Sequence, residues 1–139
     1  MAGIVGRQRG IPDISMDASC ASAAAVYGNN GSYPAQPPSW STACGTSLAA
    51  PMFAGIVAPA AQQAGHTLGA INPALYRMAA SRAPGIVDVM RGDNAFTFSS
   101  HGKTHTVAGF HAQRGYDLVS GLGTIDAARF VPELARAAG

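Results

Sequence analysis

Ser47 is the residue best suited to nucleophilic chemistry, because it follows Gly45-Thr46 and precedes a long apolar segment. A serine at the start of a helix lies near backbone N–H groups that have no intrahelical acceptor and can receive an oxyanion. A glycine two residues earlier lets a substrate carbonyl come close. We therefore treat Ser47 as a candidate nucleophile. The competing interpretation is that Ser47 only caps the helix.

Asp88 and Asp117 are two further residues whose side chains could do chemistry, in this case by binding a metal ion. They lie in separate segments, and the second is followed by a loop with glycines at 121 and 123. Two carboxylates together with exposed backbone oxygens are the ligands that a hard cation such as calcium prefers. Without further information, a helix-capping aspartate and a turn aspartate explain the same residues.

Cys20 and Cys44 are the only two cysteines of the chain. All four histidines come later in the sequence, so no zinc-ligand spacing can be written around the cysteines. A disulfide bond and a pair of buried thiols both remain open.

The elements that must position these residues are short and mixed in type. A brief strand is expected at residues 11–16, and a loose hairpin with arms near 25–27 and 40–44 is expected around Asn29-Asn30-Gly31. The remaining expectations are a helix at 48–63 buried on all sides, a helix at 72–79 begun by Asn72-Pro73, an extended segment at 86–89, two strands at 96–98 and 104–107, and a final helix at 126–137 with a break near Pro132.

Composition limits the function classes. The 139 residues carry 9 Lys+Arg and 7 Asp+Glu, so the net charge is 9 − 7 = +2, and 47% of the residues are hydrophobic. These values favour one globular domain over residues 1–139 and argue against a disordered chain or a charge-driven nucleic-acid binder. The longest apolar stretch is too short for a bilayer, and the first residues contain no signal peptide. We expect neither a nucleic-acid nor a membrane partner.

The segment from Gly45 to Gly55 resembles the nucleophile segment of subtilisin-like peptidases, in which Gly-Thr-Ser is followed by a proline and then Ala-Gly. Leu48-Ala49 and Met52-Phe53 are closer to the sedolisin (serine-carboxyl peptidase) pattern. Three further stretches resemble sedolisin motifs: Arg9-Gly10-Ile11-Pro12-Asp13-Ile14-Ser15, Ile71-Asn72-Pro73-Ala74-Leu75-Tyr76 and Gly115-Tyr116-Asp117-Leu118-Val119-Ser120-Gly121-Leu122-Gly123. The four occur in the family's order.

The resemblance implies an α/β fold, namely the C-terminal part of a subtilisin-like parallel-sheet domain with a buried nucleophile helix and a calcium-binding loop region. It implies that Ser47 is the catalytic nucleophile. It also implies one calcium ion, held by the side chains of Asp88 and Asp117 and by the carbonyls of Val89, Gln113 and Gly115. Gln113 stands where the family usually has glycine.

The family's base does not accompany the nucleophile. Sedolisins activate the serine with a glutamate, supported by an aspartate four residues later, and use a further aspartate for the oxyanion. All three precede the serine, whereas only Asp13 and Asp17 precede Ser47 here, and the only glutamate is Glu133. No histidine precedes Ser47, which excludes the subtilisin order, and no run of strands supports an α/β-hydrolase order through Asp88.

The sequence thus predicts part of a secreted, acid-acting serine endopeptidase that cleaves peptides or proteins and is inactive alone. The N-terminal half that carries the Glu/Asp base would be its partner. The alternative is a non-catalytic calcium-binding fragment or degenerate homologue that acts as an interaction module. In a third, weaker interpretation the chain is a peptide-binding module with an open sheet edge.

Overall fold

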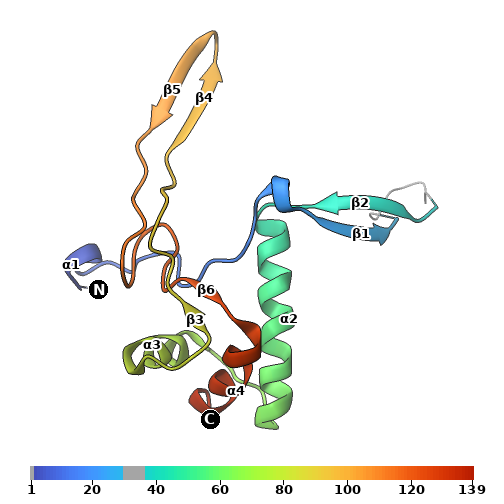
Figure 1. Cartoon of the computed structure of the whole chain (residues 1–139), viewed down its shortest axis with the longest axis vertical. Helices are drawn as coiled ribbons and strands as arrows, with labels where there is room; N and C mark the ends of the chain where they lie inside the picture. Colours follow the sequence, from blue (N-terminus) through green and yellow to red (C-terminus); the bar gives the residue numbers. More distant parts are fainter. Residues whose placement is uncertain (1, 30–36) are drawn as a thin grey trace. The chain divides into compact units, whose positions relative to one another are not determined.

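A computed structural model describes residues 2–29 and 37–139, which form two compact units (Figure 1). One unit is Met16–Ile56, and the other combines Met1–Ser15 with Val57–Gly139. In chain order the elements are α1 (Ala2–Val5), the 3₁₀ turn η1 (Cys20–Ser22), β1 (Ala24–Gly28), β2 (Ser39–Ala43), α2 (Thr46–Ala64), α3 (Asn72–Ser81), β3 (Ile86–Val87), β4 (Phe96–Ser100), β5 (Lys103–Val107), β6 (Thr124–Ile125) and α4 (Ala127–Ala137).

The unit Met16–Ile56 contains the hairpin that the turn residues predict. β1 and β2 pair antiparallel, and Tyr27 lies opposite Trp40 with their ring centroids 5.3 Å apart. Cross-strand aromatic pairs of this kind stabilise a two-stranded sheet. Asn30 and Gly31 of the expected turn lie outside the described residues.

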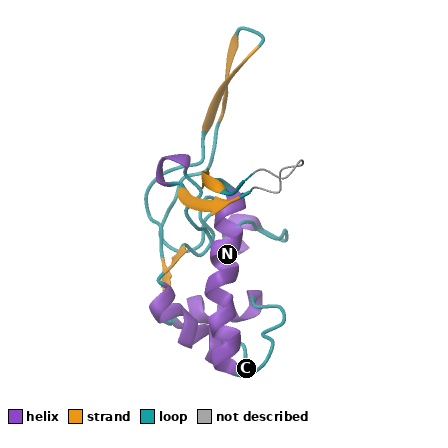
Figure 2. Cartoon of the chain, turned by 90° about the vertical axis from the view of Figure 1, so that its right-hand side faces the viewer, coloured by secondary structure: helices purple, strands orange, loops and turns teal. Residues whose placement is uncertain are grey.

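The predicted helix after Ser47 is present as α2, but the prediction that it is buried on all sides is wrong. The helix is drawn as a continuous ribbon in Figure 2. Only Leu48 and Ala60 of its residues are buried, and Met52 is 39% exposed. An apolar sequence indicates which side chains favour burial, but burial also requires another element that packs against the helix. The described part of the chain provides too little surface to cover α2. Within residues 2–29 and 37–139, no helix is long and apolar enough to cross a membrane.

The other unit has its core between α3 and α4. Leu75 and Met78 of α3 and Phe130 and Leu134 of α4 are buried. The predicted start of α3 is confirmed, but the Asn72 side chain does not cap the helix; it binds Asp13 instead. The break expected in the last helix is also wrong.

α4 continues through Pro132, which costs one backbone hydrogen bond. The burial of Phe130 and Leu134 on either side of the proline offsets that loss, because these two side chains are fully enclosed. At the start of α4 the Asp126 side chain accepts a hydrogen bond from the Arg129 N–H and caps the helix.

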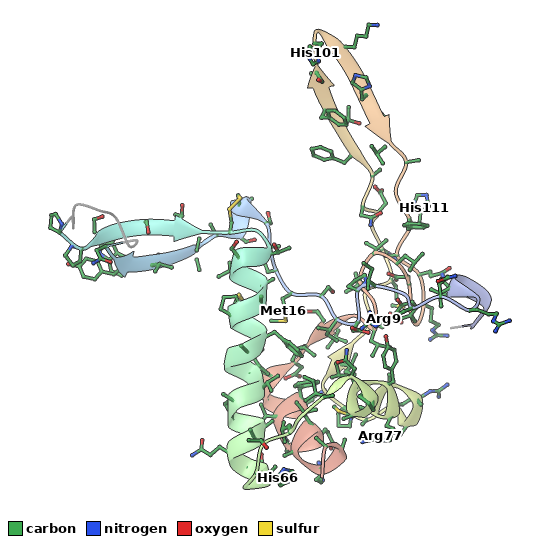
Figure 3. All side chains as sticks on the ribbon, turned by 180° about the vertical axis from the view of Figure 1, so that it is seen from behind. Arg9, Met16, His66, Arg77, His101 and His111 are labelled. Atoms are coloured by element: carbon green, nitrogen blue, oxygen red, sulfur yellow. A yellow bond between two sulfur atoms is a disulfide. The ribbon has the colours of Figure 1, made fainter. Side chains whose placement is uncertain are left out.

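All strand pairs among the described residues are antiparallel, in three two-stranded sheets, β1–β2, β3–β6 and β4–β5. The chain is therefore of mixed α and β type. The two predicted strands around Ser100-His101-Gly102 are confirmed as β4 and β5, with His101 at the tip of the hairpin and His111 near its base (Figure 3).

The strand expected at residues 11–16 is not formed. That segment makes two separate backbone hydrogen bonds, Leu122 N–H to Asp13 O and Ser15 N–H to Gly123 O, both 2.9 Å long. An alternating apolar pattern does not by itself supply the continuous ladder of bonds that defines a strand. The extended segment expected at 86–89 forms only the two-residue strand β3.

Candidate functional site: a serine at a helix start and two aspartates on one loop

Ser47 is the second residue of α2 and is exposed to solvent. Gly45, just before the helix, has φ +75°, a left-handed conformation that glycine adopts without steric cost. The Gly45 carbonyl accepts the N–H groups of Leu48 and Ala49 at 3.0 and 3.3 Å, which closes the first turn. The earlier N–H groups of Thr46 and Ser47 belong to the turn that an α-helix leaves without intrahelical acceptors, so they are free to face an anionic atom.

The described surroundings of Ser47 contain no group that could accept its proton. Asp17 is the only charged residue of the unit Met16–Ile56, and no charged residue or histidine occurs from 18 to 65. Asp17 accepts the Ser19 N–H at 2.9 Å, and hydrogen bonds from Ser22 and Ser19 lower its pKa. Its carboxylate is therefore occupied at η1, and the unit that contains Ser47 has no other carboxylate and no histidine.

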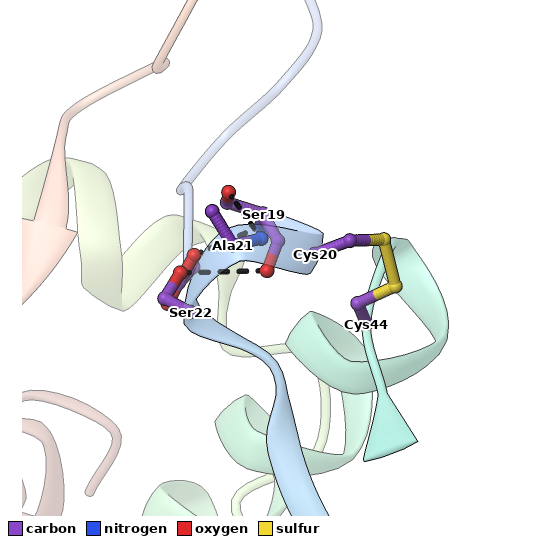
Figure 4. The surroundings of a disulfide bond; sticks show 6 residues. Ser19, Cys20, Ala21, Ser22 and Cys44 are labelled. Atoms are coloured by element: carbon purple, nitrogen blue, oxygen red, sulfur yellow. Dashed lines mark hydrogen bonds between the residues drawn. A yellow bond between two sulfur atoms is a disulfide. The ribbon is translucent and has the colours of Figure 1, made fainter.

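A disulfide bond joins Cys20 to Cys44, three residues before Ser47 (Figure 4). Close to it, the Gly45 N–H donates to the Ala18 carbonyl at 2.8 Å. Ser19 caps the η1 turn through a 3.1 Å hydrogen bond from the Ala21 N–H to its side chain. The start of α2 is thus attached to the segment before β1 by one covalent bond and one hydrogen bond.

Asp117 is the most completely hydrogen-bonded carboxylate of the described chain. It is 1% exposed, and its Oδ1 accepts the N–H groups of Val119 and Ser120 and the Ser120 hydroxyl, while Oδ2 accepts the Gln113 N–H at 3.0 Å. Burial by itself raises the pKa of Asp117, but these hydrogen bonds favour the ionised form and hold the pKa below its ordinary value. Asp117 is therefore a buried anion at neutral pH.

Asp88 approaches the same loop from the end of β3. Its Oδ2 accepts the Gly115 N–H at 2.8 Å, only two residues from the Gln113 N–H that Asp117 binds. Its Oδ1 is buried and accepts no hydrogen bond from residues 2–29 or 37–139. The structure thus brings both predicted carboxylates to residues 113–115, with one buried oxygen left unsatisfied.

The donor atoms here are of the kind that a calcium ion binds. Among the described residues Asp88 Oδ1 accepts no hydrogen bond and Asp117 Oδ2 accepts one, and the three carbonyls expected as ligands come from the same two segments. A buried anionic oxygen without a donor is costly, and a cation would remove that cost. Asp88 also lines a pocket whose wall includes Arg82 and Arg114. These two arginines are the only cationic residues in the lining of that pocket.

The site is poor in acidic side chains. Among the residues that the structure describes, no group of three or more His, Cys, Asp or Glu side chains could hold a metal ion. The predicted site has two carboxylates and three carbonyls, so its ligands are mostly backbone atoms.

Asp13 is a structurally central residue to which the sequence analysis assigned no role. Its carboxylate accepts Arg9 Nη2 at 2.5 Å, Asn72 Nδ2 at 2.8 Å and the Tyr76 hydroxyl at 2.6 Å. Burial and the carboxylate together raise the pKa of Tyr76. The Tyr116 hydroxyl is buried without a partner among the described residues and lines a pocket with Asp13 and Tyr76.

Three of the four motif-like stretches therefore meet at Asp13. Arg9 and Asp13 belong to the stretch 9–15. Asn72 and Tyr76 belong to the second of these stretches, 71–76, and Tyr116 belongs to the third, 115–123. Gly121 of the third also packs against Asp13, since a Cβ at this position would lie 2.5 Å from the Asp13 carbonyl. The sequence does indicate that these polar side chains could be important, because each stretch places an ionisable or amide side chain among apolar residues. It does not indicate that the side chains of different stretches contact one another, because no local pattern predicts contacts between distant segments.

No family model matches the chain, and no significantly similar curated protein or solved structure was found. The functional interpretation therefore depends on the residues and on their geometry.

Proposed function

We propose that this chain is the nucleophile-bearing and calcium-binding portion of a serine-carboxyl endopeptidase. The observation that carries the proposal is the position of Ser47, exposed in the first turn of α2 directly after a left-handed glycine. There its hydroxyl can attack a peptide carbonyl while first-turn N–H groups hold the oxyanion. In the assembled enzyme the chain would supply the C-terminal part of a subtilisin-like parallel-sheet domain.

A second polypeptide would supply the base. The unit around Ser47 has no carboxylate or histidine other than Asp17, whose carboxylate is already hydrogen-bonded, and α2 exposes apolar residues such as Met52 that a partner could cover. The partner expected from the sedolisin resemblance carries a glutamate and an aspartate. A carboxylate base remains able to accept a proton at acidic pH, where histidine is already charged, so the assembled enzyme would act in acid on peptide or protein substrates.

The Cys20–Cys44 disulfide supports an extracellular location, because disulfides persist in oxidising compartments. The unsatisfied Asp88 Oδ1 beside the Asp117 loop supports one calcium ion as the cofactor. Its role would be structural, since it would neutralise two carboxylates that hold one loop.

Hydrolysis in the presence of a partner tests the peptidase proposal. The chain is assayed with an unstructured protein substrate at acidic and neutral pH, alone and co-expressed with the product of the upstream reading frame. We expect hydrolysis only at acidic pH, only in the co-expressed sample, and only when that product contains Glu-x-x-x-Asp. Ser47→Ala should abolish it, whereas Ser39→Ala, which changes an exposed serine of β2, should not.

Serine-dependent hydrolysis by the chain alone would contradict the requirement for a partner. Hydrolysis by the co-expressed pair that survives Ser47→Ala would contradict the role of Ser47.

Calcium binding is tested by thermal unfolding with calcium and with a chelator. Binding to the folded state alone raises stability by about 2.7 kcal/mol when free calcium is 100 times its dissociation constant. Asp88→Asn keeps an acceptor for the Gly115 N–H but loses the anionic Oδ1, so it should lose most of the calcium-dependent rise. Asp126→Asn, a capping aspartate of α4, is the matched control and should keep the full rise.

A midpoint that is the same with calcium and with chelator in the wild type would exclude the metal site. The alternative function, a non-catalytic calcium-binding interaction module, is favoured by one observation: the carboxylates for calcium lie within this chain, whereas the base for Ser47 does not. Calcium binding without hydrolysis in the co-expressed sample would support that alternative.

A further inference from the structure

The β4–β5 hairpin, residues 93–111, separates its side chains onto two faces. The strand register places Phe96 opposite Val107, Phe98 opposite His105 and Ser100 opposite Lys103, and alternation puts all of these on one face. The other face carries only hydroxyl side chains, Thr97, Ser99, Thr104 and Thr106, with the Thr97 and Thr106 Oγ1 atoms 3.1 Å apart. One face is therefore aromatic and cationic, and the other is polar and uncharged.

The aromatic face is not covered by any other part of the described chain. Phe96 is 63% exposed, Phe98 is 41% exposed and Val107 is 57% exposed, and β4 and β5 form a sheet of only two strands. Phe98 stacks on Phe96 at 5.9 Å and on His105 at 5.3 Å between ring centroids. The rings are thus ordered against one another and still open to a partner.

Beyond Asp93 at its base, the hairpin has no acidic side chain. Residues 94–112 contain Lys103, His101, His105 and His111 and no Asp or Glu. Asp93 lies at the base, where its backbone pairs with His111 and its carboxylate accepts the Ala95 N–H. No acidic side chain occurs among residues 94–112 to pair with these basic groups, and histidine is the side-chain type whose charge changes near neutral pH.

The turn brings the cationic residues together at the tip. His101 and Gly102 have φ values of +50° and +72°, the conformation of a type I′ two-residue turn. His101 lies at this tip (Figure 3), and Lys103 follows Gly102 in the sequence. With His105 opposite Phe98, the end of the hairpin carries three basic side chains near the phenylalanine rings.

The hairpin β1–β2 provides an internal comparison. It also exposes aromatic side chains, Tyr27 at 60% and Trp40 at 72%, but no residue between 18 and 65 is charged. Exposed aromatic rings occur in both hairpins, whereas the combination with cations occurs only in β4–β5.

We propose that the aromatic and cationic face of the β4–β5 hairpin docks on an anionic lipid surface, and that acidic pH strengthens the docking. An anionic bilayer offers negative headgroups for Lys103, His101 and His105 and, a few ångströms deeper, an apolar phase for Phe96 and Phe98. A uniformly acidic polypeptide such as poly-glutamate would satisfy the cations but would leave the rings in water. This peripheral contact departs from the expectation of no membrane partner, which considered only whole-chain charge and membrane-spanning length.

Vesicle co-sedimentation of the full chain tests this proposal at about pH 7.5 and about pH 5.5. The vesicles are phosphatidylcholine alone and phosphatidylcholine mixed with phosphatidylserine. Each cation near an anionic leaflet strengthens binding about fivefold, so two newly charged histidines predict a rise of roughly 25-fold in partitioning to the anionic vesicles at the lower pH. Partitioning to phosphatidylcholine alone should stay weak at both pH values.

Two double variants separate the contributions. His101→Asn with His105→Gln should lose most of the pH-dependent rise, and asparagine suits the first position of a type I′ turn, so the hairpin should remain folded. Phe96→Thr with Phe98→Thr keeps strand propensity and should lower binding at both pH values. His66→Gln and Trp40→Thr are the matched controls, a histidine outside the hairpin and an exposed aromatic of the uncharged hairpin, and both should bind like the wild type.

Several outcomes would overturn the proposal. Absence of binding to anionic vesicles at the lower pH is one, and equal binding to phosphatidylcholine alone is another. A full pH-dependent rise in the double histidine variant would place the sensor elsewhere. Displacement of the chain from vesicles by soluble poly-glutamate at equal charge would show that an acidic polypeptide is the better partner.

Discussion

The Asp13 carboxylate joins parts of the chain that are far apart in sequence. It binds a guanidinium four residues earlier, and an amide and a phenol that lie 59 and 63 residues later. A carboxylate with several donors, one of them charged, is held more strongly than one with a single neutral donor. Replacing a donor therefore affects both the local geometry and the association of α3 with the N-terminal segment.

Tyr76→Phe should alter the dependence of stability on alkaline pH. The pKa of Tyr76 is raised in the folded protein by burial and by Asp13, whereas in the unfolded chain tyrosine ionises near pH 10. Below pH 10 Tyr76 is protonated in both the folded and the unfolded state, and the stabilisation from its raised pKa is fully present. Above pH 10 the unfolded state releases the proton first, so the free energy of unfolding falls by about 1.4 kcal/mol per pH unit for this one group.

Urea unfolding at several pH values between about 9 and 11 measures this effect. The wild type should lose stability more steeply than Tyr76→Phe, which should itself cost about 1 kcal/mol at neutral pH through the lost hydrogen bond. Tyr27→Phe, in an exposed position on β1, should follow the wild-type slope. Parallel slopes for Tyr76→Phe and the wild type would show that Tyr76 ionises alike in both states.

At the scale of elements, those with strong local signals were predictable. Asn72-Pro73 marks the start of α3, and the His101-Gly102 turn between two alternating segments marks β4 and β5. The segment 11–16 was misassigned because its conformation depends on two bonds to residues more than 100 positions away. The Asp13 contacts escaped prediction for the same reason, since sequence periodicity reports only on neighbours along the chain.

The C-terminus of α3 ends at a non-glycine residue with a strained backbone conformation, which a substitution could relieve. Arg82 ends the helix with φ +55°, and this left-handed conformation directs the next N–H, that of Ala83, to the Met78 carbonyl at 2.9 Å. A side chain in this region is disfavoured, and glycine is the residue that helices usually place there. Arg82→Gly should therefore stabilise the protein by about 0.5–1 kcal/mol, as the urea midpoint would show.

Ala80→Gly is the matched control for this prediction. Ala80 lies within the same helix in an ordinary right-handed position, and glycine there should destabilise by about 1 kcal/mol. Equal effects of the two glycine substitutions would mean that backbone flexibility, and not the left-handed position, determines the result.

At the scale of the whole molecule, two stabilising features act on different units. The Cys20–Cys44 bond closes the segment between them in Met16–Ile56, and the proposed calcium ion would join Asp88 to Asp117 in the other unit. The disulfide is worth about 3 kcal/mol by loop entropy for a sequence separation of this size. The two cysteines made a disulfide possible, and the calcium ion stays a prediction from the two aspartates. The division into units could not be predicted, because no linker separates them.

Segment-resolved hydrogen exchange should distinguish these two stabilisers. Calcium should slow exchange at the N–H groups that bind the two carboxylates, those of Gln113, Gly115, Val119 and Ser120. A reductant should accelerate exchange in β1 and β2. Acceleration by the reductant at residues 113–120, to the same degree as in the hairpin, would show that the disulfide stabilises the chain globally.

The Cys20–Cys44 bond also has a consequence for how the chain can change in evolution or by design. The disulfide holds together the two ends of the segment that contains β1 and β2, so this segment is a covalently closed loop. Its length and composition can vary without moving residue 44, and hence without displacing Ser47 three positions later. The region from residue 24 to residue 43 is therefore the natural position at which to graft, shorten or exchange a loop beside the nucleophile.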